Sequence, residues 1–242
     1  MNYSVIWNGG ILQAFFKSFT IGSATGFIMT AGAVILCIII PYLLGSINVS
    51  IIISSKCYSD DIRLHGSGNA GMTNVMRTYG KKMAVITFAG DFAKAVISSL
   101  FGRLLFGYYG AVIAGLFCFL GHIFPCYYHF KGGKGVVTAA AMVLMTEWRA
   151  FIVLLLMFVV IVAVTKYVSL GSVVSMLLYP IVLDRLGHQG FSVLIAFIMG
   201  IMCAFAHREN IKRIMSGKES KLSFKSRGKK SDGESADVND ND

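Results

Sequence analysis

Long apolar runs recur between residues 27 and 206, and they constrain the fold more than any other feature of this chain. Several runs are long enough to cross a bilayer core of about 30 Å. Lipid offers no hydrogen-bond partner to backbone N–H and C=O groups, so a segment that crosses it must satisfy those groups internally. The sequence therefore predicts an all-α fold, a polytopic helical bundle in a membrane.

The apolar runs divide into about seven transmembrane helices. Short polar or glycine-containing stretches separate them, and the longest polar stretch inside the bundle covers residues 55–82. Pro41 lies inside the first run and is expected to kink it. The seven expected spans are residues 31–54, 83–107, 111–124, 136–146, 150–165, 168–183 and 191–206.

The distribution of basic residues predicts the orientation of the bundle. Lysine and arginine are favoured in cytoplasmic loops, so a formal charge of +10 is first a statement about topology. With the 55–82 stretch inside the cell, most basic residues fall on the cytoplasmic face and only four on the outer face: Lys17, Arg103, Arg149 and Arg185. This predicts an outer N-terminus, a cytoplasmic C-terminus and all polar clusters on the cytoplasmic face.

Composition divides the chain into three parts. Residues 1–26 form an N-terminal extension, expected on the outer face or in the interface, without the basic start and cleavage site of a signal peptide. Residues 27–214 form the membrane domain. Residues 215–242 are rich in lysine and serine, then acidic, and are expected to be a disordered cytoplasmic tail. The five cysteines show no CxxC spacing, so neither a disulfide framework nor a metal site is expected.

A short loop, here called the second glycine loop, places three glycines and two lysines in the five residues Lys131–Gly135. Glycine lets successive backbone N–H groups turn toward one anion, and lysine adds a mobile positive charge. Helical patterning resumes at Val136, so a helix N-terminus adds partial positive charge. The pattern favours phosphate binding by Lys131, Gly132, Gly133, Lys134 and Gly135. The alternative is a basic turn that only holds the orientation of the protein in the membrane.

An earlier segment, here called the first glycine loop, covers Gly66–Gly71 and matches GxGxxG. It is a weak dinucleotide fingerprint, because no strand precedes it and no acidic residue follows at the ribose position. Hydroxyls, amides and a guanidinium in and after it could instead form a second anion site. An ordinary turn-rich loop is the alternative. The candidate phosphate contacts are Gly66, Ser67, Gly68, Asn69, Thr73, Asn74 and Arg77.

Further polar groups lie at or inside the bundle. Asp91 and Lys94 share a helical face at mid-span, where they could contact a ligand or carry a proton, although a charge pair that fixes packing is favoured. His207 and Asn210 project together at the cytoplasmic end, where His207 could act as a base or cap the helix. Ser172 offers a hydroxyl at the same end. The other histidines, His65, His122, His129 and His188, are expected to be structural or interfacial.

Five motifs occur in the order found in one bacterial family: GSGNAGMTNVMRTYG (66–80), DFAK (91–94), GHIFPCYYHFKGGKGVVT (121–138), YVSLGSVVS (167–175) and HRENIKRI (207–214). Across residues 41–214 the chain resembles the acyl-phosphate-dependent glycerol-3-phosphate acyltransferases. These are integral membrane enzymes of phospholipid synthesis with seven transmembrane helices and cytoplasmic motifs. The resemblance places functional residues at Ser67, Arg77, Lys134, Ser172, His207 and Asn210.

The resemblance implies transfer of a fatty acyl group from acyl phosphate to the 1-hydroxyl of glycerol 3-phosphate. The products are lysophosphatidic acid and inorganic phosphate, and the site lies on the cytoplasmic side of the bacterial inner membrane. An acyl phosphate is already activated, so a covalent enzyme intermediate is not required. The sequence shows no evident metal site, and no cofactor or metal is expected. The base is either His207 or a phosphate oxygen of a substrate.

The implied partners are the two substrates, the lipid bilayer and other membrane-associated enzymes of phospholipid synthesis, with no role for nucleic acid. The rival function is a membrane carrier for glycerol phosphate or another organic anion. Basic loops on one face would serve a carrier as an entry vestibule, but the sequence shows no internal repeat of the kind common in carriers.

Overall fold

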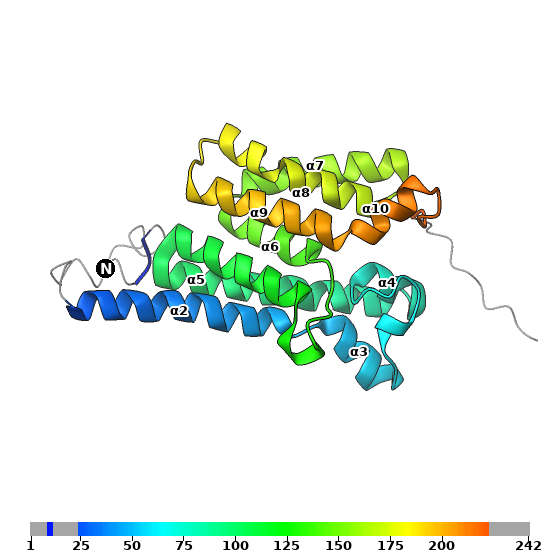
Figure 1. The fold of residues 1–242 in the computed structure, drawn as a ribbon, viewed down its shortest axis with the longest axis horizontal. Helices are drawn as coiled ribbons and strands as arrows, with labels where there is room; N and C mark the ends of the chain where they lie inside the picture. Colours follow the sequence, from blue (N-terminus) through cyan, green and yellow to red (C-terminus); the bar gives the residue numbers. More distant parts are fainter. Residues whose placement is uncertain (1–8, 12–23, 223–242) are drawn as a thin grey trace, which may run out of the picture.

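The computed structural model describes residues 9–11 and 24–222, and the regular structure in these ranges is helical (Figure 1). The helices run roughly parallel or antiparallel to one long axis. In chain order they are α2 (Ala24–Ser46), α3 (Val49–Tyr58), η1 (Ile62–Leu64), α4 (Met72–Thr78), α5 (Lys81–Ile123), η2 (Cys126–Tyr128), α6 (Val136–Thr146), α7 (Trp148–Thr165), α8 (Val168–Arg185), α9 (Phe191–Ala206) and α10 (Arg208–Met215).

The long helix α5 reverses direction at its middle. Phe106 and Gly107 depart from helical backbone angles, and Gly107 has a φ of 61°, which glycine adopts without strain. The two arms, residues 81–105 and 108–123, then pack against each other through glycines. A Cβ at Gly102 would overlap the carbonyl of Gly110, so the backbones touch there. The predicted turn near residues 108–110 is thus a sharp bend at Phe106 and Gly107.

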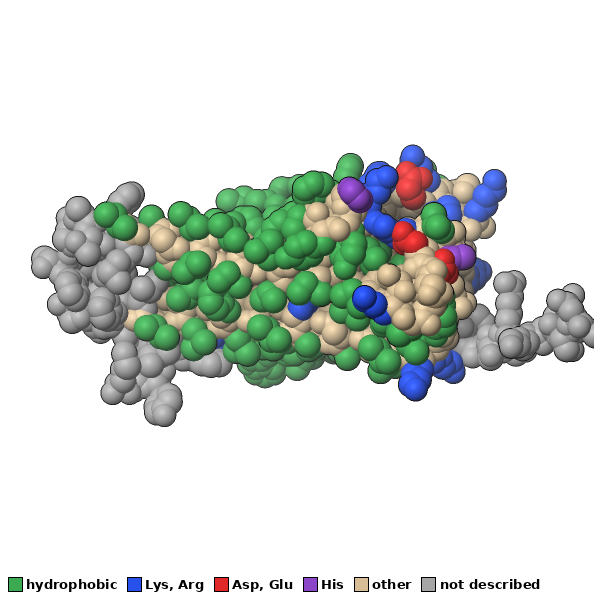
Figure 2. All heavy atoms as spheres, turned by 90° about the horizontal axis from the view of Figure 1, so that it is seen from below, with side chains coloured by type: hydrophobic (Ala, Val, Ile, Leu, Met, Phe, Trp, Pro, Cys, Tyr) green, Lys and Arg blue, Asp and Glu red, His purple; other side chains and the backbone are tan. Residues whose placement is uncertain are grey.

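The helical, membrane-spanning class of the fold is confirmed. Four segments are long and apolar enough to cross a bilayer: Thr30–Tyr58, Lys81–Tyr128, Trp148–Thr165 and Val168–Arg185. Helices α9 and α10, bent by 57° relative to each other, add a fifth if they count as one span. Figure 2 shows hydrophobic side chains over most of one face, with many of the charges gathered at the end where Figure 1 places α4 and α10.

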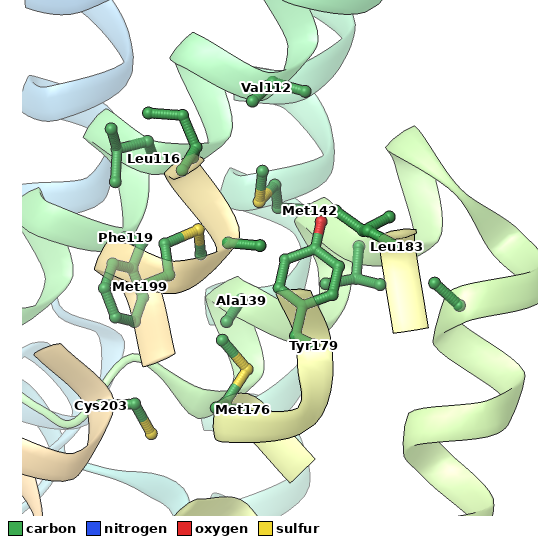
Figure 3. Packing of buried hydrophobic residues seen from close by; sticks show 14 of the residues in the cluster. Val112, Leu116, Phe119, Ala139, Met142, Met176, Tyr179, Leu183, Met199 and Cys203 are labelled. Atoms are coloured by element: carbon green, nitrogen blue, oxygen red, sulfur yellow. The ribbon is translucent and has the colours of Figure 1, made fainter. Parts of the chain in front are cut away.

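Close packing of small and apolar residues joins the helices. In lipid, helix association depends on van der Waals contact and on small residues that let backbones approach. A Cβ at Gly45 of α2 would overlap the backbone of Cys118 in the second arm of α5. A larger cluster joins α5, α6, α8 and α9, with Phe119, Met142, Tyr179 and Met199 almost fully buried at its centre (Figure 3).

The first predicted span is interrupted. Pro41 lies inside α2, but the helix continues past it to Ser46. The chain then breaks at residues 47–48, and α3 begins at Val49 with Asn48 as its N-cap: the Asn48 side chain accepts a hydrogen bond from the backbone N–H of Ile51. The discontinuity therefore falls six residues beyond the proline, at a residue type that favours helix starts.

The two predicted end segments lie largely outside the described residues. Of the extension 1–26, residues 9–11 and 24–26 are described; residues 24–26 begin α2, and Gly10 lies against the backbone of Leu105 at the bend of α5. At the other end, residues 223–242 of the predicted tail are outside the described ranges. Residues 216–222 are described, and they belong to the site below.

Candidate functional site

A cavity of about 350 Å³ opens between α4, the start of α6, α7, α8 and α10. Its lining includes the six residues that the resemblance singled out: Ser67, Arg77, Lys134, Ser172, His207 and Asn210. They come from five separate segments spread over 144 positions of the sequence. The structure therefore brings residues of the separate motifs together at one cavity.

The first glycine loop is held in shape by Asn74. Its side-chain oxygen accepts from the backbone N–H of Ser67 (3.0 Å), and its amide nitrogen donates to the carbonyls of Ile62 (3.1 Å) and His65 (2.9 Å). Gly66 and Gly68 adopt φ values of 57° and 70°. Because the amide of Asn74 is already engaged, this residue shapes the loop. Ser67, Asn69 and Thr73 line the cavity.

The second glycine loop is anchored to the end of α5. The N–H groups of Gly132 and Gly133 donate to the carbonyls of Ile123 (3.2 Å) and His122 (3.1 Å). Gly135 has a φ of 77° and precedes α6, and a Cβ there would overlap the ring of Phe119. This path turns Lys134 into the cavity and leaves Lys131 exposed.

Lys134 begins a chain of polar contacts at the cavity. Its ammonium donates to the side-chain oxygen of Asn210, and the amide nitrogen of Asn210 donates to Glu219 (2.6 Å). Burial lowers the pKa of Lys134 from 10.5 to about 8, partly offset by Glu219. The lysine is therefore largely charged at neutral pH, in a setting where desolvation strengthens its attraction to an anion.

His207 is almost fully buried and is oriented by the helix that precedes it. Its Nδ1 lies 2.8 Å from the carbonyl oxygen of Cys203. A carbonyl can only accept, so Nδ1 carries the proton of the neutral ring and Nε2 carries the lone pair. Burial, with the charge of Lys134, lowers the pKa of His207 to about 4. His207 is thus a neutral hydrogen-bond acceptor at physiological pH and a weak base.

Residues 216–222, at the start of the segment expected to be a disordered tail, fold back onto the cavity. Glu219 accepts from Ser169 Oγ (2.8 Å) and Arg213 Nε (2.8 Å) as well as from Asn210. The backbone N–H of Leu222 donates to the carbonyl of Lys166 (2.7 Å). The composition of this segment does not indicate its fold, because its contacts are polar. Its single carboxylate accepts hydrogen bonds from three donors on α8 and α10.

The predicted phosphate contacts divide into two groups. The lining includes Ser67, Asn69, Thr73, Asn74, Arg77, Lys134 and Gly135. Five others lie in the two loops but outside the cavity wall: Gly66, Gly68, Lys131, Gly132 and Gly133. Four of these five are glycines, which shape the backbone of the loops, and the fifth, Lys131, is exposed. The lining also includes Asp91, His122, Ser169 and Glu219, none of which was a predicted site residue.

One wall of the cavity is apolar. It is formed by α6, α7 and α8 with Val136, Val137, Ala140, Val143, Phe151, Leu154, Leu155, Phe158, Val168 and Met176. The cavity therefore joins a cationic, hydroxyl-rich end to a hydrocarbon wall. Such a space suits a ligand with a phosphate head and an alkyl chain.

Comparison with known proteins agrees with this chemistry. The model of the family described as glycerol-3-phosphate acyltransferase matches residues 35–217. The glycerol-3-phosphate acyltransferase of Finegoldia magna is 43% identical over 188 residues, which cover 76% of this chain and 93% of that protein. That of Thermoanaerobacter pseudethanolicus is 39% identical over 191 residues, covering 79% and 96%.

Two solved structures share the fold. Crystal structures of PlsY, an integral membrane glycerol 3-phosphate acyltransferase, superpose with TM-scores of 0.75 for the glycerol 3-phosphate form and 0.73 for the lysophosphatidic acid form. Sequence identities are 35% and 34%, and in each case 79% of this chain and 96% of the other are covered. The chain belongs to the glycerol-3-phosphate acyltransferase family.

Proposed function

We propose that this enzyme transfers a fatty acyl group from acyl phosphate to the 1-hydroxyl of glycerol 3-phosphate, releasing lysophosphatidic acid and inorganic phosphate. Family membership and the glycerol 3-phosphate and lysophosphatidic acid forms of PlsY support the acceptor and the product. The observation that carries the proposal for the donor is the cavity itself. Its cationic end and its apolar wall together match a molecule that is a phosphate at one end and an alkyl chain at the other.

The residues at the polar end have distinct roles in this reaction. Lys134 and Arg77 neutralise phosphate charge, and the hydroxyls of Ser67 and Ser172 donate to phosphate oxygens. Ser172 Oγ bonds to the carbonyl of Val168 (2.9 Å) in this structure, so its hydroxyl proton rotates toward a phosphate when one binds. Positioning and charge stabilisation by these groups supply most of the rate enhancement.

The chemical step is a direct acyl transfer. The C1 oxygen of glycerol 3-phosphate attacks the acyl carbonyl carbon, a new C–O ester bond forms, and the bond from that carbon to the phosphate oxygen breaks. The phosphate leaves with the bonding electron pair. Lys134 stabilises the charge that develops on it, and no residue of the enzyme is acylated.

The proton of the attacking hydroxyl goes to a phosphate oxygen. Burial and the charge of Lys134 lower the pKa of His207 to about 4 and make its imidazole a weak base, whereas a substrate supplies phosphate oxygens as acceptors next to the attacking hydroxyl. His207 Nε2 instead accepts a hydrogen bond from a substrate hydroxyl and orients it. This assigns the base to substrate and an orienting role to histidine.

The proposed placement is the bacterial inner membrane, with seven crossings made by α2, the two arms of α5, α6, α7, α8 and α9. The N-terminus lies outside and the cavity faces the cytoplasm. The reversal of α5 supports counting its arms separately. We place the catalytic domain at residues 27–222, because residues 216–222 complete the cavity. The bilayer delivers the acyl donor, and other enzymes of phospholipid synthesis in the same membrane supply it and consume the product.

The experiment that tests this function separates an enzyme from an anion carrier. Purified protein is supplied with labelled glycerol 3-phosphate, first in detergent with palmitoyl phosphate and then in sealed vesicles without a donor. The proposal expects labelled lysophosphatidic acid that depends on palmitoyl phosphate. Accumulation of label inside vesicles with no lipid product would instead establish a carrier.

A further inference from the structure

A cluster of buried polar residues lies inside the bundle beside the cavity, and none of its members was a predicted site residue. Asp91, Lys94 and His122 are 2%, 7% and 4% exposed. Lys94 Nζ lies 2.8 Å from Asp91 Oδ1 and 3.0 Å from His122 Nδ1. Charges at this depth are costly unless paired, and Asp91 with Lys94 forms the favoured pair expected from the sequence. His122, expected to be structural or interfacial, joins this pair.

Lys94 connects this cluster to the break between α2 and α3. Its Nζ donates to the carbonyl oxygens of Gly45 (2.9 Å) and Ile47 (2.6 Å). These carbonyls lie where α2 ends, and a cation is favourable at the C-terminal end of a helix. Asn48, the N-cap of α3, also donates through Nδ2 to the carbonyl of Ala70 in the first glycine loop (3.4 Å). Lys94 therefore binds the end of α2 before the break, and Asn48 connects the start of α3 after it to the first glycine loop.

Lys94 also fixes the tautomer of His122. An ammonium group has three donors and no acceptor, so Nδ1 of His122 must accept and the ring proton resides on Nε2. Nε2 lies against the second glycine loop: a Cβ placed on Gly133 would overlap Nε2 and lie 2.6 Å from the carbonyl oxygen of Ala70. The imidazole thus sits where the two glycine loops meet.

The backbone of His122 supports the same junction. Its carbonyl accepts from the N–H of Gly133 (3.1 Å), so both the main chain and the side chain of this residue contact the second glycine loop. Asp91 and His122 both line the cavity that holds Lys134 and Arg77. A change in ring position would move Gly133 relative to Ala70, and with it the lysine one residue further on.

We propose that His122, held by Lys94 and Asp91, is a positioning residue that sets the separation of the two glycine loops and so the geometry of the phosphate site. The proposal rests on the proposed function for the identity of the substrates. In this proposal Asp91 and Lys94 do more than neutralise each other, because they orient the imidazole of His122 at the junction of the two glycine loops.

Two variants of His122 separate orientation from simple filling of space. In His122→Asn the side-chain oxygen can still accept from Lys94, but the part of the ring that reaches Gly133 is lost. In His122→Gln the amide extends to the position of Nε2 and restores a donor there, but the acceptor that faces Lys94 is lost, so this variant keeps only the reach toward Gly133. His188→Asn is the matched control, because the ring of His188 is likewise held by polar neighbours, Glu147 and Tyr108, but in a cluster that contributes nothing to the cavity lining.

Each variant is purified as the full chain. Three quantities are measured: the KM for glycerol 3-phosphate and for palmitoyl phosphate, kcat, and the dissociation constant for inorganic phosphate from the shift in Tm. We expect His122→Asn to raise both KM values and the phosphate dissociation constant by about tenfold with kcat within about threefold, the pattern of lost uniform binding. His122→Gln should stay within about threefold of wild type, and His188→Asn should leave all three unchanged.

Wild-type phosphate affinity in folded His122→Asn would overturn the proposal, as would a folded His122→Gln variant that binds phosphate about tenfold more weakly. If His122→Asn does not fold, the His122→Gln result alone decides. A wild-type protein that binds phosphate but forms no lysophosphatidic acid would refute the proposed function. The dissociation constants for inorganic phosphate would still test whether His122 positions the two loops.

Discussion

Replacing Lys134 with alanine is the most informative single change at the cavity. The side chain is largely buried, and its ammonium donates to Asn210 in the network that ends at Glu219. It follows Gly133 and precedes Gly135, so the loop backbone is fixed by glycine geometry and by bonds to α5, which Lys134→Ala leaves intact. The variant should therefore fold and insert, and the loss should fall on phosphate binding and catalysis.

The expected magnitude follows from the contact that is lost. One charge-assisted hydrogen bond to a phosphate contributes about 1.5–3 kcal/mol, which corresponds to roughly a ten- to hundredfold loss in kcat/KM. Lys134 is proposed to stabilise charge that develops on the leaving phosphate. Interactions that strengthen in the transition state raise kcat, so the loss should appear in kcat as well as in KM.

The assay follows labelled lysophosphatidic acid at varied glycerol 3-phosphate and varied palmitoyl phosphate. Lys212→Ala is the control, because this lysine lies on α10 near Asn210 but is 72% exposed and pairs with Glu209. It should keep nearly full activity. A Lys134→Ala enzyme with near-normal kcat/KM would reduce this lysine to a determinant of membrane orientation and refute the assignment.

Three further predictions follow from the same geometry. Because the pKa of Lys134 is about 8, its charge is lost as the pH rises, so kcat/KM of the free enzyme should fall above about pH 8; a profile flat to pH 10 would show that this charge is not needed. Glu219→Gln removes a carboxylate whose pKa is lowered by donors at Asn210, Arg213 and Ser169 against the opposing effect of burial, so its stabilising effect is present at neutral pH and is lost as the pH falls through that lowered pKa. This variant should lower kcat/KM about tenfold and lower Tm, whereas Glu209→Gln on the exposed side of α10 should do neither. In a Cys57→Ser background, cysteines introduced at positions 67, 134 and 210 should react with an impermeant reagent only from the cytoplasmic side, and labelling from outside would overturn the orientation.

The sequence was sufficient to predict the class of the fold and part of the polar lining of the cavity. Apolar runs identify membrane helices because a segment in lipid must form its backbone hydrogen bonds internally. Lys134 was predicted from its place among glycines, since only a backbone built for close approach concentrates glycine in that way. Local patterns singled out Ser67, Ser172, His207 and Asn210 one segment at a time, and the ordered motifs assigned them to one site.

The parts that sequence reasoning missed depend on tertiary neighbours. Nothing near His122 in the chain indicates that Lys94 holds its ring, because the two residues lie on different arms of α5. Glu219 sits in a lysine- and serine-rich segment whose composition is typical of disorder, and its order comes from three donors on α8 and α10. The kink expected at Pro41 stays a prediction, whereas the break after Ser46 was not predicted, because the Lys94 contacts to Gly45 and Ile47 are not visible in the sequence.

In the proposed reaction, one cavity recognises phosphate on the acyl donor as well as on the acceptor. The direct measurement compares palmitoyl phosphate with palmitoyl thioesters as donors to purified enzyme, and quantifies lysophosphatidic acid and inorganic phosphate in the same reaction. We expect one phosphate to be released for each lysophosphatidic acid formed, and thioesters should be poor donors because they lack the donor phosphate that the cationic end binds. Comparable rates with a thioester, or phosphate release that does not match lipid product, would contradict it.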